Sequence, residues 1–475
     1  MGKAKKELLS GIIYTAVTKY SGIIINIIVT AFLARMLPPS DFGVVAIASV
    51  LIHFFSMLSD MGLGPAIIQK KDLGQQDLRS IFTLSFYIGL ILTVIFFFSS
   101  HTIANYYDNE KLITITQIFS IAVFFHCLDV VPNSLLKKAK RFRFIAVRNI
   151  IVNLIGGTLA ILAAYHSFGV YSLLIQPILS SIILFILDYQ QNILHLVSII
   201  QRESIKKIFS FSIYQFMFSF INYFSRNLDI LLGGKVFGIK ELGYYEKSYT
   251  LMVLPVKNLS HIITPAIQPI FSEYQNDESW LFTRSMALFK VLLFIGFPLT
   301  AFLFFSSEEI IILFLGNQWY GAVPIFKILS LSVGIQIIYS PQGAFFQSAN
   351  AVKKLFSCGL VTAFLSVSAV LVGCFILHSI TGMAWLIVIA YFFAFLNVYY
   401  VMVKKVFHQK FSKFLSIMIE PLLYTFLLFV LLFVFDSFSK EWSLITRLII
   451  KILIYFSVMI SFELKTKLIR GIMKK

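Results

Sequence analysis

A small group of charged side chains lies inside long apolar stretches of this chain. Lys19, Arg226 and Lys257 are cations, and a fixed positive charge in a medium of low dielectric constant binds an anion such as a pyrophosphate strongly. A carboxylate in the same surroundings pairs with a cation, binds a proton or binds a sodium ion. The acids that could couple ions or form ion pairs in this way are Asp60, Asp129, Asp188 and Asp229.

Simple ion pairing is an alternative for each acid. Arg226 and Asp229 are three positions apart, which places them on one face of a helix, where they could pair with each other. Asp60, Asp129 and Asp188 precede loops rich in Lys and Arg, so pairing with those loops is equally open. No arrangement of residues identifies a coupling ion, so coupling to protons or to sodium remains open.

The sequence offers no recognisable catalytic or metal-binding motif. The three cysteines lie in apolar stretches without metal-ligand spacing: Cys127, Cys358 and Cys374. There is no nucleophilic triad, zinc motif or phosphate-binding loop. We therefore expect a protein that is not an enzyme and has no cofactor and no metal site.

The elements that must position these charges are membrane helices. Apolar residues make up 58% of the 475 positions, charged residues 13%, and the mean hydropathy is +0.86. A helix needs roughly 20 apolar residues to cross the hydrocarbon core of a bilayer. The chain is predicted to be an all-α polytopic membrane protein with about fourteen such helices. The predicted spans are 11–35, 43–66, 80–104, 112–136, 145–166, 170–191, 208–233, 243–268, 285–306, 321–346, 355–378, 381–403, 414–435 and 443–463.

The distribution of basic residues predicts the topology. The net charge is +18, but most of the 40 Lys and Arg residues fall in every second gap between spans, as cytoplasmic loops require. Both termini are therefore expected in the cytoplasm. The same charges are expected to attract anionic membrane lipids rather than nucleic acid.

The two halves of the chain are similar to each other when one is shifted by 200 residues. Asp41-Phe42-Gly43 then aligns with Glu241-Leu242-Gly243, and Pro65-Ala66-Ile67 aligns with Pro265-Ala266-Ile267. Repeats separated by six helices have the same orientation, which predicts two parallel six-helix lobes. The predicted lobes are 1–200 and 201–405, followed by an additional two-helix segment at 406–475.

The stretch ARMLPPSDFG at 34–43, followed after one helix by DMGLGPAI at 60–67, resembles the bacterial polysaccharide exporters of the multidrug/oligosaccharidyl-lipid/polysaccharide superfamily. FGIKELGYYEKSYTL and PQGAFFQSAN are similar to the same family, in particular to its colanic-acid and teichuronic-acid exporters. The resemblance covers essentially the whole chain. It implies two lobes around a central cavity, and alternating access that moves a lipid-pyrophosphate-linked sugar outward.

The first functional hypothesis is therefore a flippase for an undecaprenyl-pyrophosphate-linked oligosaccharide in the bacterial cytoplasmic membrane. We expect it to be a monomer. A cation-coupled drug antiporter of the same superfamily is an alternative, although it would need an acidic cavity rather than the three cations. A membrane polysaccharide polymerase is a third reading, from another class. Such an enzyme would carry a large outer loop with acid, base or Arg groups, and the outer loops here are short.

Overall fold

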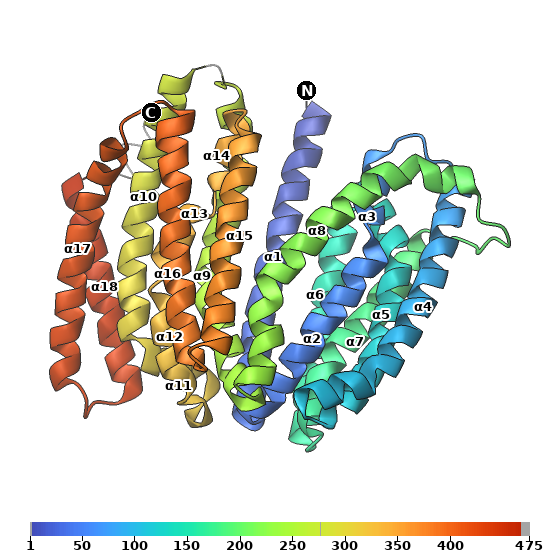
Figure 1. Ribbon diagram of the computed structural model, residues 1–475, viewed down its shortest axis with the longest axis horizontal. Coiled ribbons are helices and arrows are strands. Elements are labelled where there is room, and N and C mark those ends of the chain that lie inside the picture. Colours follow the sequence, from blue (N-terminus) through green and yellow to red (C-terminus); the bar gives the residue numbers. More distant parts are fainter. Residues whose placement is uncertain (1, 276, 467–475) are drawn as a thin grey trace. The chain divides into compact units, whose positions relative to one another are not determined.

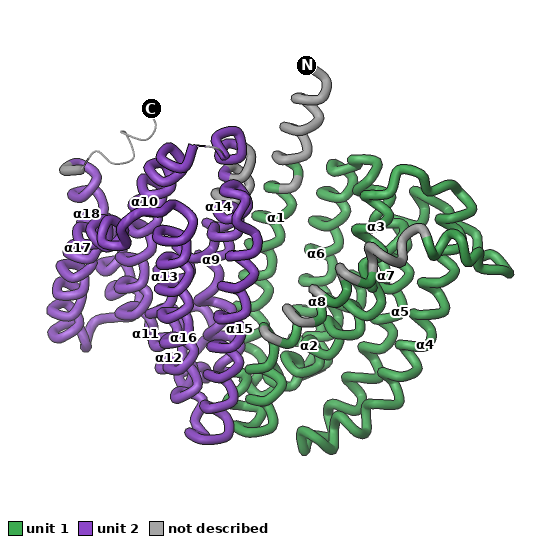
Figure 2. Tube along the Cα trace, turned by 45° about the horizontal axis from the view of Figure 1, so that its top comes forward, with its two compact units in different colours: residues 1–243 green, residues 244–475 purple. Residues whose placement is uncertain are grey.

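The computed structural model describes residues 2–275 and 277–466. Within these ranges the side chains of 2–13, 15, 465–466 and parts of 207–225 and 261–269 are outside the description. The described residues form helices joined by short connections and contain no strand (Figure 1). The chain divides into two compact units, Met1–Gly243 and Tyr244–Lys475 (Figure 2).

Unit 1 is built around α5. This helix packs against α2, α3, α4 and α7, while α6 packs between α1 and α7. The last long helix of the unit, α8, packs against α2, α3 and α4. The helices are α1 (Gly2–Met36), α2 (Pro39–Asp60), α3 (Leu63–Gln69), α4 (Gln75–Tyr107), α5 (Lys111–Lys138), α6 (Phe142–Tyr165), the short η1 (Gly169–Tyr171), α7 (Ser172–Gln191) and α8 (Arg202–Val236).

Unit 2 has α10 and α16 at its centre. Helix α10 packs against α12, α13 and α17, and α16 packs against α12, α13 and α15. The C-terminal pair α17 and α18 also reaches α11 through α18. The helices are α9 (Ile239–Ser272, which begins in unit 1), α10 (Glu278–Phe305), α11 (Ser307–Leu315), η2 (Asn317–Trp319), α12 (Ala322–Ser330), α13 (Val333–Tyr339), α14 (Gln342–Ser348), α15 (Val352–Phe375), α16 (Ile380–Tyr400), η3 (Val401–Val406), α17 (Phe411–Phe438) and α18 (Leu444–Thr466).

The prediction of an all-α, multi-span membrane protein is confirmed. In the described residues, 11 helices are long and apolar enough to cross a membrane, or up to 12 if the bent pair Ala322–Ser330 and Val333–Ser348 is one span. Helices α8 and α9 cover the predicted spans 208–233 and 243–268 but are not among these 11 helices. The count of fourteen therefore stays a prediction, as does the lobe boundary at 200/201.

Two predicted spans are interrupted in the structure. The span 43–66 breaks where Met61 and Gly62 adopt left-handed conformations, so that α3 starts afresh at Leu63. The span 321–346 consists of α12, α13 and α14. The short helix α11 was not predicted, because nine residues are far too few to cross a bilayer.

The two turns aligned by the 200-residue shift pack on each other within unit 1. A Cβ built on Gly43 would lie 1.9 Å from the carbonyl oxygen of Ile239, and one on Gly243 would lie 2.1 Å from that of Pro39. Pro39 and Ile239 are themselves a pair in the alignment, so the two contacts are reciprocal. Such contacts are those of a local two-fold axis, and only glycine permits this close approach of two backbones.

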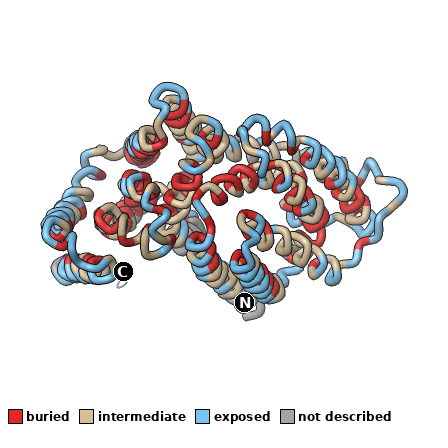
Figure 3. The backbone as a smooth tube through the Cα atoms, turned by 90° about the horizontal axis from the view of Figure 1, so that it is seen from below, coloured by how far each residue is buried: buried red, intermediate tan, exposed pale blue. Residues whose placement is uncertain are grey.

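Burial follows the pattern of a membrane protein. In each unit, buried residues lie where helices face their neighbours, and many large apolar side chains on the other faces are exposed (Figure 3). Phe98, Phe364 and Phe426 are 73%, 72% and 68% exposed. Lipid tails rather than water suit such faces.

Candidate functional site

The three predicted cations are accessible on their helices to different degrees. Arg226 and Lys257 are exposed, on α8 and α9, and Lys19 is half-buried on α1. Along their own helices they lie far from the nearer end: Lys19 about 25 Å from Met36, Arg226 about 15 Å from Val236 and Lys257 about 22 Å from Ser272. All three fall inside predicted spans, where a charge against lipid is very costly, so these side chains are expected to face water.

Uncharged polar groups extend the hydrophilic surface of unit 1. Gln176 on α7 donates a hydrogen bond from Nε2 to Oδ1 of Asn26 on α1 over 3.0 Å; Asn26 is exposed and Gln176 is half-buried. The side chain of Asn153 on α6 lies near Gly22 on α1, which precedes Asn26 by about one helical turn. Amides that are exposed within apolar helices also favour water over lipid. Helices α1, α6 and α7 therefore present a polar surface in the apolar part of the unit.

Two of the predicted acids make local contacts. Asp60 accepts a hydrogen bond from the backbone N–H of Gly64 over 3.0 Å and so bridges the break between α2 and α3. Asp229 accepts one from the N–H of Ile230 over 2.9 Å. Asp60 thus has a clear structural role, in addition to any part in coupling.

The other two acids meet in the interior of unit 1. Asp188 on α7 is fully buried, and its Oδ1 lies 2.5 Å from Nη1 of Arg148 on α6, which is 3% exposed. The carboxyl of Asp129 on α5 is within hydrogen-bonding reach of that of Asp188. Asn133 donates to Asp129 Oδ2 over 3.1 Å. The ion pairing that the sequence left open is thus realised for Asp188, but by Arg148.

Arg148 was not among the charges that the sequence singled out. It lies within α6 and is buried. Its partner is 40 positions away in the chain, so no local spacing links the two. Only the packing of α6 on α7 brings them together.

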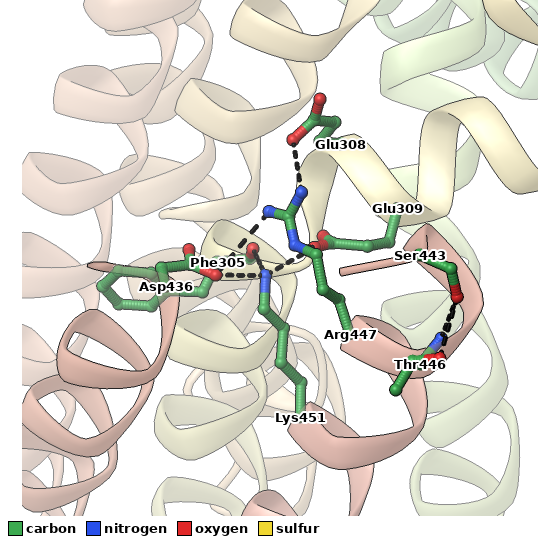
Figure 4. Close-up of polar contacts among 8 residues, drawn as sticks. All are labelled: Phe305, Glu308, Glu309, Asp436, Ser443, Thr446, Arg447 and Lys451. Carbon is green, nitrogen blue, oxygen red and sulfur yellow. Dashed lines mark hydrogen bonds and ion pairs between the residues drawn. The ribbon is translucent and has the colours of Figure 1, made fainter. Parts of the chain in front are cut away.

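A second network of buried charges lies in unit 2 and holds the C-terminal helix pair (Figure 4). Lys451 on α18 is fully buried, and its Nζ lies 2.7 Å from both Glu309 of α11 and Asp436 of α17. The same ammonium group donates to the carbonyl oxygen of Phe305 over 2.6 Å. Arg447 contacts Glu309 at 2.9 Å and Glu308 at 3.2 Å.

This network was not predicted from the sequence. Lys451 is 0% and Arg447 9% exposed. Lys290 pairs with Glu420 at 2.7 Å. Among the described residues, no group of three or more His, Cys, Asp or Glu side chains is arranged to hold a metal ion.

Comparison with known proteins shows which family the chain belongs to. The model of a family described as polysaccharide biosynthesis protein matches residues 32–324. The chain belongs to this family. The matched residues include the ARMLPPSDFG stretch and both turns of the repeat.

Curated relatives are similar over most of their length. The teichuronic acid biosynthesis protein TuaB of Bacillus subtilis is 25% identical over 347 residues, which are 72% of this chain and 72% of that protein. The lipopolysaccharide biosynthesis protein WzxC of Escherichia coli is 23% identical over 376 residues, covering 78% and 75%. The expected resemblance to teichuronic-acid and similar exporters is confirmed.

Solved structures show the same fold. The lipid II flippase MurJ in an inward closed conformation matches with a TM-score of 0.71 and 17% identity, covering 96% of this chain and 99% of that one. An inward-facing multidrug transporter of the MATE family matches with a TM-score of 0.59 and 14% identity, covering 79% and 92%. At these identities the likeness establishes the fold alone.

Proposed function

We propose that this protein is a flippase that moves a lipid-linked oligosaccharide across the membrane by alternating access. The observation that carries the proposal is the accessible positive charge of Arg226 and Lys257, with Lys19, far from the ends of long helices that cover predicted membrane spans. Exposed cations inside the membrane require water beside them, and they attract an anion into that water. The pyrophosphate of a lipid-linked sugar is such an anion. Membership of a polysaccharide biosynthesis family supports the same class of substrate.

The proposal also has finer parts, which concern the lipid carrier, the working unit and the location. We propose undecaprenyl pyrophosphate as the lipid carrier, a monomer as the working unit, and the bacterial cytoplasmic membrane as its location. The alternation of basic loops supports cytoplasmic termini. Both tails (Lys3, Lys5 and Lys6, and Lys467 to Lys475) lie outside the described side chains, so tests of topology need labelling from either side of the membrane.

The two alternative functions, a drug exporter and a polymerase, fit less well. An exporter of cationic drugs needs acids where its substrate passes, and ammonium and guanidinium groups would repel that substrate. A polymerase needs groups positioned to activate a sugar, and one relative is named as a transport protein, the succinoglycan biosynthesis transport protein ExoT of Rhizobium meliloti.

Transfer of a labelled lipid-linked oligosaccharide in proteoliposomes tests the proposal. Sugar that reaches the far leaflet becomes accessible to a membrane-impermeant lectin. Loss of one charge-assisted contact with a pyrophosphate is worth about 1.5–3 kcal/mol, so Lys19→Ala, Arg226→Ala and Lys257→Ala are each expected to weaken substrate binding roughly 10- to 150-fold.

Two controls make the result specific. Lys440→Ala removes an exposed cation from the connection between α17 and α18 and is expected to transport like the wild type. Lys19→Arg retains the charge and is expected to retain most of the transport. Unchanged transport in both Lys19→Ala and Arg226→Ala would remove the cationic path from the mechanism.

A further inference from the structure

The contact between Asp129 and Asp188 is unusual because it joins two carboxyl groups in a buried place. Asp129 is 7% exposed and Asp188 is fully buried. Each carboxyl has one oxygen already engaged, Asp129 Oδ2 by Asn133 and Asp188 Oδ1 by Arg148. The remaining oxygens, Asp129 Oδ1 and Asp188 Oδ2, have no hydrogen-bond donor in the described part of the chain.

The charges at this contact do not balance without a further positive charge. Arg148 supplies one charge, and the two carboxylates together supply two of the opposite sign. Two ionised carboxylates in contact repel each other strongly, and a buried charge left without a partner costs several kcal/mol. One additional proton brings the group to neutrality and provides the donor that the two free oxygens lack.

A proton suits this place better than a metal ion. The guanidinium group of Arg148 is already 2.5 Å from Asp188, so a second fixed cation would be repelled. No metal-binding group of three or more His, Cys, Asp or Glu side chains occurs in the described residues, whereas sodium and other hard cations need several oxygen ligands.

We propose that Asp129 and Asp188 share one proton inside unit 1, and that this proton is taken up and released as the protein transports its substrate. The proton bridges Asp129 Oδ1 and Asp188 Oδ2, while Arg148 holds the negative charge that remains. Release leaves the group with an unbalanced negative charge, which favours a conformation in which water reaches the carboxylates. The shared proton itself does not depend on the proposed transport function, whereas its uptake and release during transport rests on that function.

Two histidines lie near the pair. His126, one turn from Asp129 on α5, is exposed and interacts electrostatically with Asp129 and with Asp60 of α2. His53 on α2 is also exposed and interacts electrostatically with His126.

Other charged groups lie on α5 and on the neighbouring α4. Lys137, near the end of α5, interacts electrostatically with His126. At the start of α4, Asp77 accepts hydrogen bonds from Ser204 over 2.6 Å and from the N–H of Gly74 over 2.9 Å. Arg79 follows two positions later in α4.

Infrared difference spectroscopy of the reconstituted protein tests the proton without any substrate. A change from neutral to alkaline pH is expected to remove a protonated-carboxyl band from the wild-type spectrum. Asp129→Asn and Asp188→Asn are expected to lack that band, while Asp72→Asn, an exposed loop acid, is expected to retain it. Asp129→Asn leaves the Arg148–Asp188 pair intact, so it decides the question even if Asp188→Asn does not fold. An identical band in wild type and Asp129→Asn would overturn the proposal.

Transport under an imposed pH gradient tests the coupling. One proton per cycle shifts the steady-state distribution of labelled lipid-linked oligosaccharide between leaflets by about tenfold per pH unit. Asp129→Asn is expected to equilibrate the substrate with no response to the gradient. A wild-type distribution that ignores the pH gradient, or one that responds to a sodium gradient instead, would overturn the coupling. If the wild type moves no oligosaccharide but the carboxyl band behaves as expected, the proposed function fails and the shared proton stands.

Discussion

Replacing Lys451 with methionine is expected to be among the most destabilising single changes in unit 2. Methionine keeps most of the length of the side chain and removes only the charge. Lys451 is fully buried and has three partners, Glu309, Asp436 and the carbonyl oxygen of Phe305, all within 2.7 Å. Removing one side of a buried ion pair typically costs 3–5 kcal/mol, because the other side remains charged and unsolvated.

The structure places the expected loss at the lower end of that range. Glu309 keeps its contact with Arg447 at 2.9 Å, and Asp436 is partly exposed, so water replaces some of what Lys451 provided. We therefore expect Lys451→Met to lower the free energy of unfolding by about 3 kcal/mol. Neutralising an acid as well, in Lys451→Met/Glu309→Gln, is expected to restore about 1–2 kcal/mol of it.

Unfolding in mixed detergent micelles with increasing dodecyl sulfate measures these differences. Trp442 contacts Phe435 at the end of the C-terminal helix pair, with 5.9 Å between ring centroids, so its fluorescence reports on that pair. Lys290→Met is the matched control. Its partner Glu420 is more than a third exposed, and such a pair contributes at most about 1 kcal/mol. The reasoning is refuted if Lys451→Met costs no more than Lys290→Met, or if the added Glu309→Gln makes it worse.

Two further predictions concern the backbone turns. Gly243→Ala forces its Cβ to within 2.1 Å of the carbonyl oxygen of Pro39 and is expected to destabilise the protein by about 3 kcal/mol. The control is Gly359→Ala, whose Cβ meets no atom within 4 Å and which is expected to stabilise α15 by about 0.5–1 kcal/mol. Both are measured in the same unfolding assay. Equal effects of the two alanines would contradict the close approach of the repeat turns. Asp60→Ala removes the acceptor for the N–H of Gly64 and is expected to cost about 1 kcal/mol, whereas Asp60→Asn keeps an acceptor oxygen and is expected to retain most of the stability. An equal loss in the two variants would show that the carboxylate charge, and not the hydrogen bond, matters there.

The sequence predicted the spans well because apolar length and loop charge are local properties. The boundaries of α4, α5, α6 and α15 lie within a few residues of the predicted ones. The turn at Pro38 and Pro39 ends α1 and starts α2 as expected, since proline fits the first turn of a helix and not its interior.

The sequence did not predict which charges would be buried together. Hydropathy gives the depth of a residue along a helix but not the face on which a neighbouring helix packs. Arg148 and Lys451 both occur near helix ends, where a long cation normally reaches water. Their burial depends on acids that lie 40 and 142 positions away, on helices whose packing no local pattern reveals.

The two buried networks have the same nominal charge imbalance but different physical consequences. In unit 2, Arg447 and Lys451 face three acids, yet the side chain of Glu308 is 37% exposed, so water solvates the excess charge. In unit 1, Arg148 faces Asp129 and Asp188, and neither acid is more than 7% exposed. Water cannot solvate the excess negative charge of Asp129 and Asp188, so on our proposal a bound proton neutralises it. Because a proton can leave when the surroundings change, the network in unit 1 is suited to respond during transport, whereas the network in unit 2 is suited to hold α18 in place.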